Sequence, residues 1–118
     1  MFRTAAALAA VTLSLVAAPA LAQPDGKQLF DLQCKLCHDD ETLGPTLVGI
    51  ENRKMAATSF EYSDGLKAKG AAGTTWTDAE LDAFLKAPTA HTPGSKMMMA
   101  VGDDASRAAI IAYLKTLK

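Results

Sequence analysis

The chain has 118 residues, and its twelve Lys and Arg residues against thirteen Asp and Glu residues give a formal net charge of −1. This balance argues against a nucleic-acid partner, because proteins that bind nucleic acids normally present a basic stripe or patch. The length allows one small domain, and a domain of this size usually needs a metal or a cofactor to stabilise its limited core.

Residues 1–22 have the pattern of a secretory signal peptide. Arg3 gives a positive start, residues 5–18 form an apolar stretch, and residues 20–22 read Ala-Leu-Ala, a small-x-small cleavage site. We expect cleavage to leave residues 23–118 as one domain in the periplasm, with no stable insertion in the membrane. The alternative is a retained membrane anchor, although the apolar stretch is short for a span.

A helix is predicted to begin after Asp25, which can cap it, and to run to about Cys37. One face of this helix carries three leucines, namely Leu29, Leu32 and Leu36. The neighbouring face carries one aromatic ring and two thiols, namely Phe30, Cys34 and Cys37. We expect the first face to meet another helix and the second face to contact a cofactor.

Residues 34–38 read Cys-Lys-Leu-Cys-His, the C-x-x-C-H signature of c-type haem attachment. Two thiols on one helical turn can add across the two vinyl groups of a haem, and the adjacent histidine then lies against the iron as an axial ligand. A zinc site normally takes four Cys or His ligands, whereas this chain has two cysteines and, outside the motif, only His91. A thioredoxin-like dithiol would flank a strand–helix–strand pattern, and a structural disulfide needs no histidine, so covalent haem explains the motif best.

A turn is predicted at residues 44–49, which begin Gly-Pro and follow an acidic loop at residues 39–41. A backbone carbonyl in this turn is well placed to accept from the Nδ1–H of His38. That bond would fix the imidazole tautomer and make the iron-facing nitrogen a better donor. Residues 52–62 show no sustained period and are predicted to be loop.

Three further helices are predicted, and no segment alternates cleanly enough for a strand. The first spans residues 63–69 and ends at Gly70. The second opens at a capping box over residues 77–80, buries Leu81, Phe84 and Leu85, and stops before Pro88. The third is capped by Asp103 or Asp104 and has an apolar stripe at Ile110, Tyr113, Leu114 and Leu117. The fold class is therefore all-α.

Three consecutive methionines at residues 97–99 follow a breaker-rich stretch that includes Pro93 and Gly94. A run of three exposed methionines would be an unusual surface, whereas a thioether is a good soft ligand for haem iron. The segment is therefore predicted to supply the second axial ligand.

Taken together, these features resemble a class I cytochrome c across residues 26–118. The resemblance is carried by the attachment motif, the Gly-Pro turn, Trp76, the Pro-Gly-Ser-Lys-Met sequence at residues 93–97 and the closing Tyr-Leu-Lys at residues 113–115. It implies a small single-domain cytochrome c fold, with helices packed around one covalently attached haem c.

The resemblance also implies roles for individual residues. Cys34 and Cys37 would form the thioethers, His38 and Met97 would be the axial iron ligands, and Pro45 would accept the hydrogen bond from His38. Around the propionates it places four side chains, namely Arg53, Tyr62, Trp76 and Ser95. Where the first and last helices cross it places Gly26 and Phe30 against Ile110 and Tyr113. Near the exposed haem edge it places two docking lysines, Lys35 and Lys96.

This sequence departs from the family pattern in four ways. The loop between His38 and Gly44 is short, and the usual ring of lysines is reduced. Phe84 stands where a tyrosine hydroxyl often lies near the methionine sulfur. The spacing from Met97 to Gly102 is one residue longer than in mitochondrial proteins, which leaves Met98 and Met99 as alternative ligands.

A haem whose two axial positions are filled by protein has no open site for a substrate, so its accessible chemistry is the transfer of one electron. We therefore expect a monomeric carrier, not an enzyme, that shuttles electrons between respiratory or photosynthetic complexes. Donors and acceptors of this kind include a quinol–cytochrome c reductase and a terminal oxidase. The alternatives are a fixed electron-entry subunit of a periplasmic oxidoreductase and a haem peroxidase or gas-binding protein.

Overall fold

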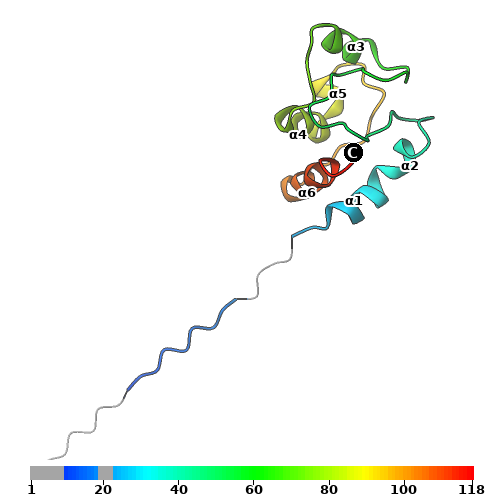
Figure 1. Cartoon of the computed structure of the whole chain (residues 1–118). Helices are drawn as coiled ribbons and strands as arrows, with labels where there is room; N and C mark the ends of the chain where they lie inside the picture. Colours follow the sequence, from blue (N-terminus) through cyan, green and yellow to red (C-terminus); the bar gives the residue numbers. More distant parts are fainter. Residues whose placement is uncertain (1–9, 19–22) are drawn as a thin grey trace, which may run out of the picture.

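The computed structural model describes residues 10–18 and 23–118, and Figure 1 shows their arrangement. Residues 10–18 carry no helix or strand, and their side chains are exposed. The predicted cleavage site at residues 20–22 and most of the predicted signal peptide lie outside the described residues. No helix in the described part of the chain has both the length and the hydropathy that crossing a membrane requires.

Six helices make up the domain: α1 (Gly26–Gln33), α2 (Lys35–His38), α3 (Asp64–Ala71), α4 (Asp78–Lys86), α5 (Pro88–His91) and α6 (Asp104–Leu114). Across residues 10–18 and 23–118 the only strand-like pairing is an isolated bridge between Lys54 and Thr75. The predicted all-α class is therefore confirmed.

The four longest helices begin at capping residues, three of which were predicted as caps. The side chain of each cap accepts a backbone N–H of the first turn, and the caps are Asp25, Ser63, Thr77 and Asp103. Each cap contributes about 1 kcal/mol by satisfying a donor that the helix itself leaves free. Of the two aspartates that could begin the closing helix, Asp103 is the cap.

The helix predicted from Asp25 to Cys37 is two helices, because the backbone departs from regular helical geometry at Cys34, where φ is −110°. The prediction that the leucine face packs against another helix was wrong for two of its members, since Leu32 is 73% exposed and Leu36 is 85% exposed. The face that packs instead follows Gly26, Leu29, Phe30 and Cys34, which recur at the same helical spacing one step round the helix.

Helix α3 continues through Gly70, where the sequence predicted its end. A Cβ atom on Gly70 would lie 2.2 Å from the backbone oxygen of Met55, so this glycine permits close packing inside the helix. The chain turns later, at Gly73, where φ is +83°. Helix α5 was not predicted. It is a single turn that begins with Pro88, a residue suited to the first position of a helix.

Helices α1 and α6 lie side by side, as the cyan and red ribbons of Figure 1 show. A Cβ on Gly26 would lie 2.1 Å from the carbonyl oxygen of Ala109, so no larger residue fits at this crossing. One turn further on, the rings of Phe30 and Tyr113 are 5.1 Å apart between centroids. The contact brings the start and the end of the domain together and sets the position of the attachment motif.

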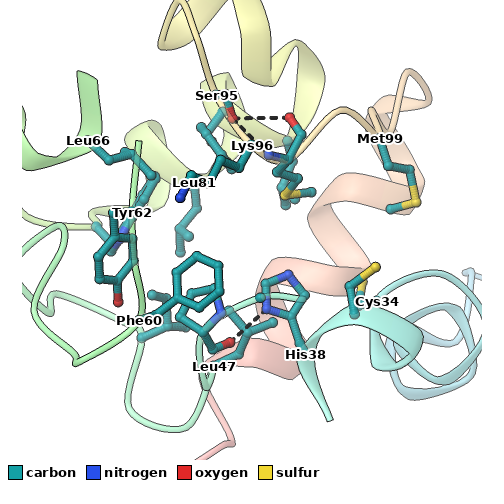
Figure 2. A pocket seen from close by; sticks show the side chains of 18 of the residues that line it. Cys34, His38, Leu47, Phe60, Tyr62, Leu66, Leu81, Ser95, Lys96 and Met99 are labelled. Atoms are coloured by element: carbon teal, nitrogen blue, oxygen red, sulfur yellow. Dashed lines mark hydrogen bonds between the residues drawn. The ribbon is translucent and has the colours of Figure 1, made fainter. Parts of the chain in front are cut away.

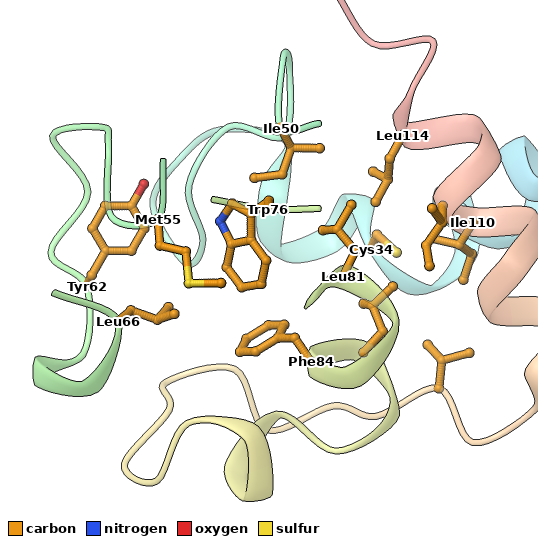
Figure 3. Packing of buried hydrophobic residues seen from close by; sticks show 13 residues of the cluster. Cys34, Ile50, Met55, Tyr62, Leu66, Trp76, Leu81, Phe84, Ile110 and Leu114 are labelled. Carbon is orange, nitrogen blue, oxygen red and sulfur yellow. The ribbon is translucent and has the colours of Figure 1, made fainter. Parts of the chain in front are cut away.

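The core lies between α3, α4, α6 and the loop of residues 50–62 (Figure 3). Met55 and Ile110 are fully buried in it, and Trp76 packs edge-on against Phe84 at 5.1 Å. This core forms the floor of the pocket described below.

Arg107 ties the end of the methionine segment to this core. Its buried guanidinium donates to Asp82 on α4 at 2.9 Å and to the backbone oxygens of Val101 and Gly102, each at 3.0 Å. It also bonds Asp104 at the start of α6. The guanidinium thus joins α4, α6 and the methionine segment at one point.

Candidate haem-binding site

A cavity of about 360 Å³ opens between the attachment motif and the methionine segment. Figure 2 shows Cys34 and His38 on one wall and Ser95, Lys96 and Met99 on the facing wall. Other side chains that line it are mostly apolar or aromatic, and they include Leu43, Leu47, Ile50, Phe60, Leu66, Leu81, Phe84, Leu85, Ile110 and Leu114. Its size and its lining suit a mostly apolar ligand.

The two cysteines line the cavity and are not joined in a disulfide. Cys34 is buried, and burial together with the neighbouring Cys37 raises the pKa of its thiol to about 11. Cys37 is exposed. No group of three or more His, Cys, Asp or Glu residues within residues 10–18 and 23–118 could hold a metal ion, so the described chain offers nothing that resembles a zinc site.

His38 is oriented by the Gly-Pro turn. Its Nδ1 lies 2.7 Å from the backbone oxygen of Pro45, and because a carbonyl can only accept, Nδ1 carries the proton. This leaves Nε2 with a free lone pair, and Figure 2 shows the ring projecting into the cavity. A Cβ on Gly44 would lie 2.8 Å from both Nδ1 and Cε1 of the imidazole, so glycine is needed there for a steric reason that the sequence did not reveal.

The three methionines all line the cavity, but they differ in burial. Met97 is partly buried and packs against the hydrophobic core, whereas Met98 is 75% exposed and Met99 is 38% exposed. The hydroxyl of Ser95 donates to the carbonyl oxygen of Met97 at 3.1 Å and accepts from its N–H at 3.2 Å. The side chain at residue 95 therefore fixes the main chain of Met97, a contact that sequence reasoning missed.

Arg53 provides the most specific polar feature of the cavity wall. Its Nη atoms donate to the backbone oxygens of Val48 at 3.1 Å and Thr46 at 2.9 Å. Its Nε is buried without a partner in the described part of the chain. A buried donor of this kind is costly unless an acceptor reaches it, and an anionic propionate would supply that acceptor.

Tyr62 and Trp76, which the resemblance places around the propionates, also line the cavity. The hydroxyl of Tyr62 bonds Thr58 Oγ1 at 2.6 Å, which holds the phenol ring in the wall. With the imidazole, the two thiols, the thioether and the unpartnered Nε of Arg53, these residues fit a covalently held haem.

The cytochrome c family model matches residues 24–118. This chain belongs to the cytochrome c family. It is 43% identical over 96 residues to cytochrome c of Tetrahymena pyriformis, covering 78% of this chain and 85% of that protein. It is 36% identical over 98 residues to cytochrome c2 of Rhodomicrobium vannielii, covering 77% of this chain and 75% of that protein.

Solved structures show the same fold. Cytochrome cH from Methylobacterium extorquens matches with a TM-score of 0.68 at 38% identity, over 77% of this chain and 94% of that chain. Ferricytochrome c2 from Rhodopseudomonas palustris matches with a TM-score of 0.71 at 31% identity, over 79% and 96% of the two chains. The resemblance to a class I monohaem cytochrome c is therefore confirmed. Membership implies a covalently bound c-type haem and the function of an electron carrier.

The two lysines that the resemblance places near the exposed haem edge, Lys35 and Lys96, have different surroundings. The ammonium of Lys96 bonds the backbone oxygen of Glu61 at 2.5 Å and lies 5.9 Å from the ring centroid of Phe60. Although Lys96 is exposed, its ammonium therefore joins the methionine segment to the loop that carries Phe60 and Glu61. Lys35 is exposed within the attachment motif.

Proposed function

We propose that this cytochrome is a periplasmic one-electron carrier in which His38 and Met97 bind the iron of one haem. Thioethers at Cys34 and Cys37 would hold the haem in the cavity. The observation that carries the proposal is the arrangement of the two walls, with an oriented imidazole on one and a partly buried thioether on the other. When bound, the haem supplies an iron that gains and loses one electron.

Met97 is the preferred second ligand because of its position. It packs against the core and its main chain is held by Ser95, whereas Met98 projects mainly into solvent. Because such a ligand is already held in place, it moves little when the iron changes charge, so it adds little to the reorganisation energy of electron transfer. A thioether is also a weak donor that favours the ferrous state, so it raises the reduction potential.

The remaining wall residues would set the orientation and the polarity of the site. The unpartnered Nε of Arg53 would bind a propionate, with Tyr62 and Trp76 nearby. The apolar lining excludes water and disfavours the additional positive charge of the ferric state, which raises the potential further. His38 keeps its donor strength because Pro45 holds its Nδ1 proton.

The carrier would work as a diffusing monomer in the periplasm after removal of residues 1–22. Its partners would be redox proteins, such as a quinol–cytochrome c reductase on one side and a terminal oxidase on the other. A carrier must dissociate quickly, so a small interface around the cavity mouth is sufficient. Lys35, exposed within the attachment motif, would contribute to steering.

The test is a haemochrome spectrum and an intact mass of the exported protein. The proposal predicts the spectrum of a haem with two thioether bonds and the mass of residues 23–118 plus one haem. A colourless protein with the mass of bare polypeptide would contradict it. Stoichiometric co-purification with a catalytic partner would instead assign it as a fixed subunit, and rapid carbon monoxide binding to the reduced protein would assign an open sixth position.

A further inference from the structure

The second histidine of the chain, His91, lies directly behind the cavity wall. Its ring stacks on Trp76 with 6.2 Å between centroids and 22° between planes, and it meets Phe84 edge-on at 5.5 Å. Trp76 and Phe84 both line the cavity, so their rings separate His91 from the haem site by a single layer. The side chain of His91 is 8% exposed.

Two hydrogen bonds hold His91, and they remain possible whether the ring is neutral or charged. Its Nε2 lies 2.5 Å from Glu80 Oε2, and because an ionised carboxylate only accepts, Nε2 carries a proton. Its Nδ1 lies 2.7 Å from the hydroxyl of Thr92, a fully buried residue. That hydroxyl can donate to a neutral ring or accept from a protonated one by rotating its hydrogen. The pocket can therefore gain a proton without losing a bond.

We propose that His91 and Glu80 form a proton-binding site that is linked to the redox state of the haem, an inference that rests on the proposed function. A proton on His91 adds a positive charge one aromatic layer from the haem. This charge opposes the further positive charge of the ferric state and so favours reduction. The reduction potential then falls as pH rises through the titration of His91, and reduction increases the affinity of His91 for a proton by roughly three- to tenfold.

Few other charges face His91. On α4, which packs against α5, Glu80 contacts it, while Asp82 pairs with Arg107 and Asp78 pairs with Lys115. Lys86 on α4 and Asp64 on α3 are exposed, and α5 itself carries no other charged residue. A propionate held near Trp76 would be the other titratable group on this side. Because Glu80 is 35% exposed, it connects the buried ring to solvent.

The experiment measures the reduction potential of the holoprotein between about pH 5 and pH 9. In the native protein we expect the reduction potential to fall with rising pH in one step, called the wave below. His91→Gln keeps a donor toward Glu80 but cannot be protonated, so the wave should disappear and the potential at low pH should fall. Glu80→Gln removes the charge that stabilises the imidazolium, so the wave should move to lower pH. Asp64→Asn, which alters an exposed carboxylate on α3, should leave the wave unchanged.

A wave that persists unchanged in His91→Gln would overturn the inference and identify a propionate as the titrating group. A flat profile in native protein that retains the haem spectrum and the methionine band would also overturn it, while leaving the proposed function intact. If His91→Gln does not fold, nuclear magnetic resonance of the native protein decides. The ring signals of His91 should then titrate at a higher pH in the ferrous protein than in the ferric protein, and equal midpoints would refute the linkage.

Discussion

The two walls of the haem cavity are built in different ways. The histidine wall is local, because the thiols, the imidazole, Gly44 and the carbonyl of Pro45 all lie within twelve residues of chain. The methionine wall depends on distant contacts. Lys96 bonds the backbone of Glu61, 35 residues away, and Arg107, which holds Val101, is itself bonded to Asp82, 25 residues away. The segment held in this way offers three candidate sulfurs. A short motif therefore indicates a single candidate for one ligand, whereas choosing among the candidates for the other ligand requires the folded structure.

The largest effect should come from the anchor of the methionine wall. Arg107→Leu leaves the buried backbone oxygen of Val101 without its donor, and it removes a second bond to the backbone oxygen of Gly102, an exposed residue. An unpaired buried carbonyl costs about 1–3 kcal/mol of the free energy of unfolding. Thermal denaturation should show the loss, together with a weakened methionine band. Lys86→Leu is the control, because it removes an exposed cation from α4, and a comparable loss in that variant would contradict the anchoring role.

A methyl group at the histidine wall should have the next largest effect. Gly44→Ala places a Cβ 2.8 Å from the imidazole of His38, so the ring or the turn must shift. Such overpacking costs about 1–3 kcal/mol and should perturb the haem spectrum through the histidine. Gly102→Ala on the opposite wall is the matched control, since its Cβ would meet no atom within 4 Å. Equal effects of the two substitutions on stability would refute the local account of the histidine wall.

Ser95 should show a smaller effect that is confined to the methionine wall. Ser95→Ala removes two hydrogen bonds to the main chain of Met97, each worth about 0.5–1.5 kcal/mol. We expect a modest drop in the midpoint of denaturation and faster exchange of the sixth ligand, measured with added imidazole. Ser95→Thr keeps the hydroxyl and should restore both properties, and a threonine variant as weak as the alanine variant would argue against this role.

The parts of the structure that sequence reasoning predicted well rest on local chemistry. The caps at Asp25 and Thr77 act within three residues of themselves, so a short pattern reveals them. The hydrogen bond from His38 to the Gly-Pro turn spans only seven residues and was also predictable.

The features that were predicted wrongly from the sequence depend on contacts between distant segments. The prediction that the leucine face packs against another helix was wrong because a neighbouring face makes that contact. Gly26 and Phe30 on this neighbouring face meet Ala109 and Tyr113 on α6. Gly70 reads as a helix end in isolation, and only the folded structure brings the backbone of Met55 against it.

The contact between His91 and Glu80 was also not predicted from the sequence. The two residues are eleven positions apart, and the break between α4 and α5 sets their approach. The available signal was a histidine outside the attachment motif in a chain that contains only two histidines.

The most direct test of the central claim is the weak red absorption band of methionine-ligated ferric haem, measured in three variants. Met97→Leu should abolish the band and lower the reduction potential, because the iron loses its thioether ligand. Met98→Leu and Met99→Leu should retain it, since those side chains lie at the exposed mouth of the cavity. A band that survives in Met97→Leu but disappears in Met98→Leu or Met99→Leu would contradict the assignment of Met97.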